Sequence, residues 1–332
     1  MTQTANVAKN RFLFFLDKIS KILESAQASE DVANFIYTND MRTPLFMLEG
    51  LCRIYKKIYE KSGFKKLNAR FKELEDKLGE IDYYDGFFKE FQTSENIPSA
   101  LTFYTKEKKE EKMQSLNSYL KKEKWIGKHQ KAIANVLKKL NKVDWMDEKD
   151  DAKAVFEVYQ NDILKILKRY KNRTRPFSDI ENDVHELRRE LRWLSIYPQA
   201  LLGLIQMQRD DEVPETLNKY LSPEIINSPF NKMPAGSGLQ VHILLHQNYY
   251  FALSWIIAEL GKLKDQGLKI ELLEAGISSI YKTKKDVSSL AYALCENTQP
   301  PILQILNEAQ KISNTFFAEN ILEHLVVSLY KH

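Results

Sequence analysis

The chain has 332 residues, of which 43% are hydrophobic and 28% are charged, and this balance excludes an intrinsically disordered protein. Its 49 basic and 45 acidic residues leave a formal charge of +4, which is too small to indicate nucleic-acid binding by the chain as a whole. Only 11 glycines and 10 prolines occur, so the turn residues that all-β and doubly wound folds require are scarce. The composition therefore favours an all-α protein.

The first predicted helix covers residues 10–25, where apolar residues recur at helical spacing: Phe12, Phe15, Leu16, Ile19, Ile22 and Leu23. Its F-L-F-F-L run follows a lysine and an arginine, as in a signal peptide. However, the run continues at helical spacing and has no small-residue cleavage site. No apolar run approaches the ~18 residues that a membrane span requires. We therefore expect a cytoplasmic protein without a membrane-spanning segment.

The next predicted helix opens after Ser29, is interrupted near Pro44 and stops at Gly63. The stretch 64–78 repeats the helical pattern, with one apolar face made of Phe64, Leu67, Phe71, Leu74 and Leu78. A loop at 93–99 leads into a highly charged region, and a further helix is predicted at 128–142. RNA or DNA binding through lysine-rich residues 106–142 is a weak alternative, because acidic residues partly cancel the charge there.

The second half begins with a predicted helix at 151–171 and a short loop. Ser178 and Glu181 have the spacing of a capping box at the start of the following helix. That helix is predicted to run to about Met207, with a kink or break at Pro198. Residues 208–238 lack periodicity and predict a long loop, after which three or four further helices complete the chain.

The stretch N-D-V-H-E-L-R-R-E-L-R-W-L at 182–194 carries the clearest candidate site. At 100° per residue, its basic side chains form one stripe: His185, Arg188, Arg189 and Arg192. The leucines of the stretch gather on a separate face. Guanidinium groups can give two parallel hydrogen bonds to a phosphate, so the stripe could bind an anion. Alternatively, neighbouring glutamates pair with the stripe across helical turns and it is an ordinary solvated face.

The string V-H-E-L-R-R-E-L-R-W-L resembles the signature helix of the CHAD family, the conserved histidine α-helical domains. That signature is a histidine, an arginine three residues later, and basic residues at positions seven and ten. The preceding stretch at 163–173, I-L-K-I-L-K-R-Y-K-N-R, is also similar to the family. The resemblance implies two four-helix bundles related by a pseudo-two-fold axis, with one signature helix in each. It also implies polyphosphate binding in a basic central channel, without catalysis.

The sequence departs from the family pattern in both halves. Ser195 occupies position ten after the histidine, and the segment at 77–85 has Asp82 where the family has arginine. The first-half signature aligns on Arg42 in N-D-M-R. Its other aligned positions hold neither histidine nor arginine: Asn39, Phe46 and Glu49. The specific resemblance to the binding motif is therefore confined to the second half.

We accordingly predict one all-α domain over 1–332, built from two pseudo-symmetric antiparallel helical bundles at 1–147 and 148–332. The expected function is non-enzymatic binding of inorganic polyphosphate or a similar polyanion, without a cofactor. The predicted ligand-binding residues are His185, Arg188, Arg189, Arg192, Arg42 and Arg53. The alternative is a helical scaffold or protein-interaction module that keeps the fold without binding a polyanion.

H-I-L-L-H at 242–246 would place His242 and His246 on one face of a helix, at a spacing that can bind zinc. The apolar and aromatic surroundings favour histidines of the core or of a channel wall instead. Cys52 and Cys295 lie far apart, with no C-x-x-C pair. We therefore predict neither a metal site nor a disulfide.

Overall fold

The computed structural model describes residues 6–60, 63–127, 130–209, 212–282, 286–295 and 300–331, and it is all-α as predicted. The helices of the first half are α1 (Val7–Ala26), α2 (Val32–Thr38), α3 (Arg42–Ile58), α4 (Phe64–Thr93), α5 (Ser99–Lys122) and α6 (Lys131–Leu140). The predicted apolar face at 64–78 is buried in α4. Gly63 does not end α3, since it is the left-handed N-cap of α4.

The second half contains α7 (Glu148–Lys171), a π-helical turn η1 (Ile180–His185) that continues as α8 (Glu186–Ala200), α10 (Gln247–Tyr281), α11 (Val287–Leu294) and α12 (Ile302–Ala318). Three short elements lie in the region 208–238 that was predicted as a long loop: η2 (Glu215–Tyr220), α9 (Pro223–Ile226) and η3 (Pro229–Asn231). Two strands flank it, β1 (Ile205–Gln208), where the preceding helix was wrongly predicted to continue, and β2 (Val241–His246). The last element is β3 (Val326–Lys331). Nowhere in these described ranges is a helix long and apolar enough to span a membrane.

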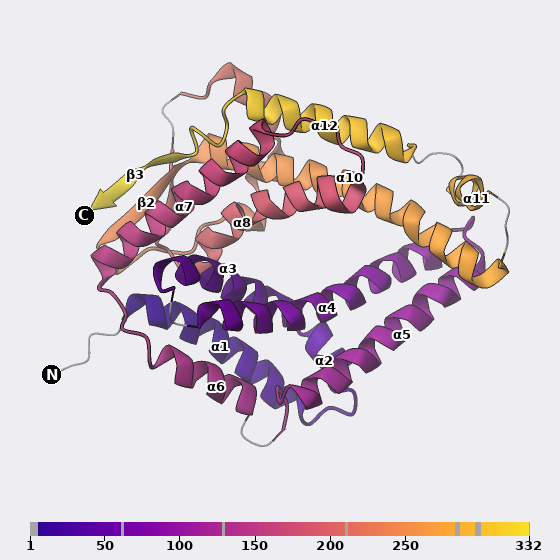
Figure 1. The fold of residues 1–332 in the computed structure, drawn as a ribbon, viewed down its shortest axis with the longest axis horizontal. Helices are drawn as coiled ribbons and strands as arrows, with labels where there is room; N and C mark the ends of the chain where they lie inside the picture. Colours follow the sequence, from indigo (N-terminus) through magenta and orange to yellow (C-terminus); the bar gives the residue numbers. More distant parts are fainter. Residues whose placement is uncertain are drawn as a thin grey trace.

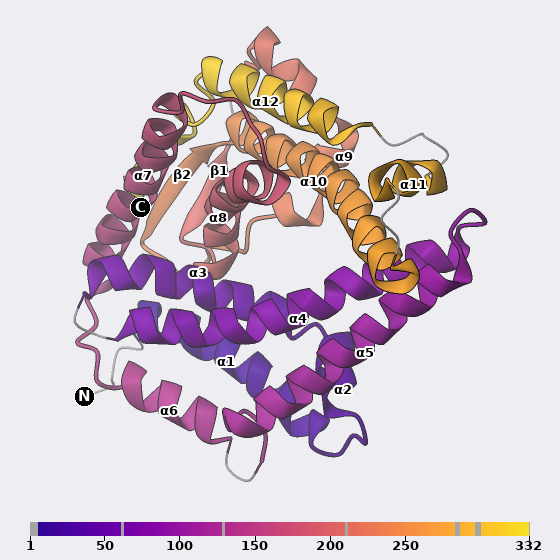
Figure 2. The same cartoon turned by 45° about the vertical axis from the view of Figure 1, so that its right-hand side comes forward.

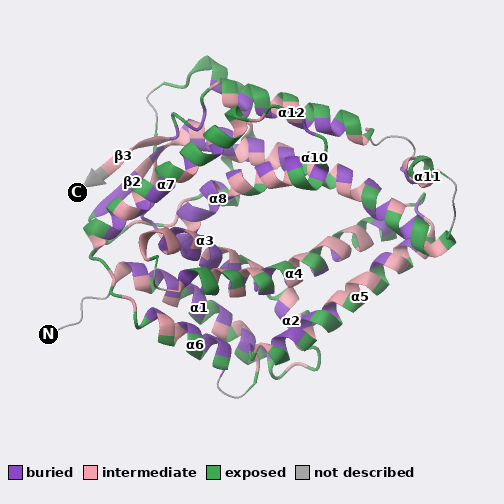
Figure 3. Ribbon diagram, viewed as in Figure 1, coloured by how far each residue is buried: buried purple, intermediate pink, exposed green. Residues whose placement is uncertain are grey.

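The helices α3 and α8 lie in the middle of the molecule (Figure 1). The other first-half helices lie beyond α3, while α7, α10 and α12 lie around α8 (Figure 2). One hydrophobic core includes residues of both halves, among them Phe12, Leu48, Leu194 and Leu253. Buried residues follow the inward faces of these helices (Figure 3). A second apolar cluster joins α4 and α5 to α10 and α11. The α3–α8 pair is therefore held within a shared core.

A three-stranded sheet of order β1-β2-β3 is the main departure from the predicted helices. Strand β2 pairs parallel to β1 and antiparallel to β3. The stretch 242–246 is therefore a strand, and the helical prediction was wrong. Four residues along a strand span roughly 13 Å, which removes the zinc-binding geometry. His242 is buried, with its Nδ1 3.1 Å from the carbonyl oxygen of Gly203.

The start of the η1–α8 helix also differs from the predicted capping box. Asp179 is the N-cap, because its side chain accepts from the backbone N–H of Asn182. Ser178 instead donates its N–H to the Asp183 carboxylate at 2.7 Å. At the other end, α8 stops at Ala200 and contains Pro198 in its last turn. Proline removes the donor for the Leu194 carbonyl, and the Tyr159 hydroxyl donates to that oxygen at 3.0 Å instead.

A buried ion pair connects α1 and α3 with α7. Arg11 Nη1 donates to Asp151 Oδ2 at 2.6 Å and to the Tyr55 hydroxyl at 2.7 Å. The Tyr55 hydroxyl in turn donates to Asp151 Oδ1 at 2.9 Å. Arg11 is 2% exposed and Asp151 is 1% exposed. Because a buried charge is costly without a partner, this triad fixes the start of the second half against the first.

Candidate anion-binding site

Arg188 and Arg192, both on α8, point toward the neighbouring helices of the core. Arg188 donates from Nε to the Ile257 carbonyl of α10 at 3.0 Å. It lies against Gly261, where a Cβ atom would come within 3.0 Å of Arg188 Nε. Burial lowers the pKa of Arg188. The absence of a side chain at position 261 therefore lets this guanidinium lie against α10.

Arg192 lies one turn further along α8, against α3. Its guanidinium carbon is 4.1 Å from the centre of the Phe46 ring, a cation–π contact. Burial, followed by the positive charges of Arg188 and Arg42, lowers the pKa of Arg192 to about 10. Among the residues that the structure describes, no carboxylate forms an ion pair with Arg188 or Arg192. These two charges are partly buried and adjacent, and the carboxylates that attract them, Asp265 for Arg188 and Glu75 for Arg192, form no ion pair with them.

Arg42 approaches the same place from the start of α3. Its Nε donates to Glu75 at 2.6 Å and its Nη1 donates to Asp82 at 2.5 Å. Gly79 lies between these two acidic residues on α4, and a Cβ there would be 2.8 Å from Arg42 Nη2. Arg42 also lies 5.3 Å from the Phe46 ring centre. The Phe46 ring therefore contacts two arginines, one from each half.

Arg53 extends the group along α3. Its guanidinium carbon is 4.4 Å from the centre of the Trp193 ring, and its Nε is buried without a hydrogen-bond partner. Trp193 packs edge-on against Phe46, with ring centres 6.4 Å apart. The Phe46 ring thus contacts Arg42 and Arg192, and the Trp193 ring contacts Arg53. We call Arg42, Arg53, Arg188 and Arg192 the arginine cluster.

Acidic residues reach this cluster from both halves: Asp265 of α10 interacts electrostatically with Arg188, and the others lie on α3 and α4. Glu49 on α3 is 2% exposed, and its Oε1 has no hydrogen-bond partner. Burial, reinforced by the negative charge of Glu75, raises the pKa of Glu49 to about 8. Its carboxyl is therefore mostly protonated at neutral pH. Glu75 and Asp82 are already paired with Arg42.

His185 and Arg189, the other two predicted residues of the α8 stripe, contact glutamates of their own helix. His185 Nδ1 lies 2.8 Å from Glu181 Oε2. Arg189, which is 46% exposed, forms an ion pair with Glu186 at 2.6 Å. The structure therefore divides the stripe. Arg188 and Arg192 face α3 and α10 without a carboxylate partner, whereas His185 and Arg189 have the local pairs expected of a solvated face.

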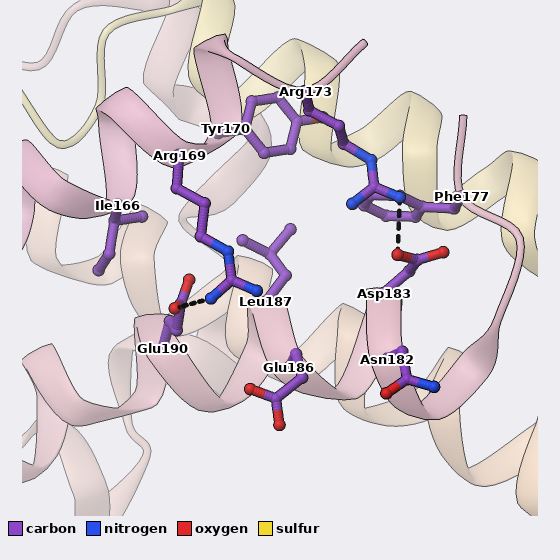
Figure 4. Close-up of a pocket in the computed structure, with 10 residues that line it drawn as sticks. All are labelled: Ile166, Arg169, Tyr170, Arg173, Phe177, Asn182, Asp183, Glu186, Leu187 and Glu190. Atoms are coloured by element: carbon purple, nitrogen blue, oxygen red, sulfur yellow. Dashed lines mark hydrogen bonds and ion pairs between the residues drawn. The ribbon is translucent and has the colours of Figure 1, made fainter. Parts of the chain in front are cut away.

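A surface pocket lies on the opposite side of α8, between that helix and the end of α7 (Figure 4). Its charged side chains pair across it. Arg169 pairs with Glu190, and Arg173 Nη2 lies 2.7 Å from Asp183 Oδ1. None of the predicted binding residues lines this pocket. Because its charges are internally compensated, it is a weaker candidate for an anion than the arginine cluster.

Comparison with protein-family models, curated proteins and solved structures finds no match to this chain. The described residues also contain no group of three or more histidine, cysteine, aspartate or glutamate side chains arranged to hold a metal ion. The segment at 77–85 is similar to a short Leu-Gly element of the CHAD family, but the sequence did not predict that Gly79 and Gly261 each lie against an arginine. One signal was visible: Leu-Gly occurs at 78–79 and again at 260–261.

Proposed function

We propose that this chain is a non-enzymatic, CHAD-like cytoplasmic module that binds inorganic polyphosphate or a similar polyanion at the arginine cluster. The observation that carries the proposal is the pair Arg188 and Arg192, which is partly buried without a carboxylate partner. Like charges held close together in a low-dielectric environment repel. A bound anion would remove this repulsion, so the free protein is organised to gain stability on binding.

The chemistry of the cluster suits phosphate groups. Each guanidinium remains charged at neutral pH and offers several N–H donors in a fixed plane. The aromatic contacts of Phe46 and Trp193 restrict how Arg192 and Arg53 can move, which reduces the entropy lost on binding. Arg188, Arg192 and Arg53 are the expected primary contacts. Arg42 contributes less, since any anion must compete there with Glu75 and Asp82.

The test compares the double variant Arg188→Gln/Arg192→Gln with wild type in titrations against linear polyphosphate. Charge-assisted hydrogen bonds contribute about 1.5–3 kcal/mol each, so the double variant should bind at least about a hundredfold more weakly. Wild-type affinity should also fall steeply between about 50 and 200 mM salt, as it does for other linear polyanions. Titration calorimetry measures both effects, and circular dichroism checks that the variant is folded.

Arg189→Gln is the matched control, because it removes one positive charge from the same helix. Arg189 is exposed and already paired with Glu186, so this variant should bind within about twofold of wild type. Unchanged affinity in the double variant would contradict the assignment of the site.

The alternative function is a helical scaffold with a protein partner. Two observations favour it: Arg42 is already neutralised by carboxylates, and several large apolar side chains are exposed, including Phe230 at 76% and Leu303 at 68%. If wild type binds no polyanion even at low salt, this alternative becomes the better account of the chain.

A further inference from the structure

Glu49 is a buried carboxyl group beside a cluster of positive charge, yet it forms no ion pair among the described residues. It lies on α3, one turn after Phe46, and its Oε1 has no hydrogen-bond partner. A carboxylate in such a position would have to be desolvated without compensation, which is costly. A protonated carboxyl avoids that cost. The geometry alone therefore favours a neutral Glu49 in the folded protein.

The charged groups around Glu49 come from three helices. On its own helix Arg53 and the Cys52 thiol interact electrostatically with it, and α4 contributes Lys72, Glu75 and Asp76. From α8, Arg192 interacts electrostatically with Glu49. The two acids of α4 raise the pKa of Glu49, while Lys72 and Arg53 lower it, and burial is the largest influence. An anion bound to Arg192 would add another negative charge to this surrounding.

We propose that Glu49 couples anion binding at the arginine cluster to proton uptake, so that the site binds polyanions more tightly as pH falls. The proposal rests on the function proposed above. When Glu49 is ionised, a proton from the buffer adds to its carboxylate as the anion binds. When Glu49 is already neutral, the anion binds without this step. The bound anion and a charged Glu49 would otherwise repel in a buried environment.

The sign of the pH dependence follows from this linkage. Below the pKa of about 8, Glu49 is protonated in the free protein and affinity does not change with pH through this group. Above it, each binding event takes up as much as one proton. Affinity then weakens by up to about tenfold per pH unit, the limit for one proton.

The experiment uses the full chain and long linear polyphosphate, in which only the two end groups titrate near neutrality. Titration calorimetry at pH 8.5–9, in two buffers of different protonation enthalpy, counts the protons taken up per binding event. We expect uptake approaching one proton for wild type. Glu49→Gln mimics the neutral carboxyl, so it should bind with wild-type affinity at pH 6.5, lose most of the uptake, and nearly retain that affinity to pH 9. The small remaining uptake comes from Arg192, whose lowered pKa a bound anion raises.

Glu157→Gln is the charge-matched control, because Glu157 is exposed on α7 and should leave proton uptake unchanged. Binding without uptake by wild type, or undiminished uptake in Glu49→Gln, would overturn this inference while leaving the proposed function intact. Absence of polyphosphate binding at every pH would overturn both. The wild-type proton count tests the coupling even if a variant folds poorly.

Discussion

Arg42 in the first half and Arg188 in the second occupy matching local settings but differ in their partners. Each lies against a glycine that follows a leucine in a neighbouring long helix, Gly79 for Arg42 and Gly261 for Arg188. Arg42 is held by two carboxylates, whereas Arg188 has one backbone carbonyl. The same packing thus supports a structural ion pair in one half and, in the other, a charge that forms no ion pair among the described residues.

The two halves also differ at the positions that follow Arg42 on α3 and Arg188 on α8. In the alignment on Arg42 and Arg188, Phe46 corresponds to Arg192, and Glu49 corresponds to Ser195. The first half therefore supplies a ring and a carboxyl group where the second supplies a cation and a hydroxyl. Phe46 packs against Arg192 itself, so the two halves meet at this point. We infer that the first half restrains the charges that the second half presents.

The largest expected effect comes from removing the first-half acid with Glu49→Gln. Because the folded-state pKa of Glu49 lies above its unfolded value, the folded protein binds more protons between about pH 4.5 and 8. Glu49 therefore lowers the stability of wild type as pH rises through that window, by at most about 5 kcal/mol. The variant should lack this loss and be the more stable protein at pH 9. Denaturant unfolding across pH measures the difference, and parallel curves for the two proteins would contradict it.

A smaller effect on folding stability distinguishes Arg42 from Arg188. Arg42→Met leaves Glu75 almost buried and unpaired, which should cost about 2–3 kcal/mol. Arg188→Met loses one hydrogen bond but also removes a partly buried charge, so its stability should stay within about 0.5 kcal/mol of wild type. Urea unfolding midpoints, with unchanged slopes, give both values. Equal losses of stability in the two variants would show that Arg42 and Arg188 contribute equally to folding, which would contradict this comparison.

The smallest expected change in folding stability comes from Arg192→Met. Arg192→Met keeps apolar contact with Phe46 and removes a charge that burial and two neighbouring arginines disfavour. Without ligand, the variant should gain about 1 kcal/mol of stability at low salt. The gain should shrink at high salt, where repulsion is screened. Thermal unfolding at two ionic strengths tests this, and a loss of stability at low salt would show that the charge of Arg192 is not disfavoured in the folded protein.

Periodicity predicted the helices because a long stretch with apolar residues at helical spacing, such as 64–78, can bury them on one face only as a helix. Strand β2 was missed because V-H-I-L-L-H is almost continuously apolar, and its buried residues do not alternate. The predicted end of the α8 helix near Met207 was wrong for a tertiary reason: residues 205–208 form strand β1, and its pairing with β2 lies outside any local pattern. Sequence patterns therefore identified elements better than their boundaries.

Helical spacing correctly placed Arg188 and Arg192 on one side of their helix. The alternative interpretation, in which glutamates pair with the stripe across helical turns, describes His185 and Arg189 but not Arg188 and Arg192. Spacing alone did not separate the two pairs, because the contacts of Arg188 and Arg192 are with neighbouring helices. The partners of Arg42 were equally hidden, since Glu75 and Asp82 are 33 and 40 residues away in the sequence. Charge balance at the site is thus a property of the packed structure.

The buried pair of Arg11 and Asp151 has a consequence for protein synthesis. Arg11 and Tyr55 leave the ribosome long before Asp151, which lies 140 residues after Arg11. Until α7 emerges, a fully packed first half would enclose a guanidinium without its counter-charge, at a cost of about 3–5 kcal/mol. The nascent chain therefore cannot complete its amino-terminal core early. Ribosome-associated folding should reach a protease-resistant state only once α7 can dock.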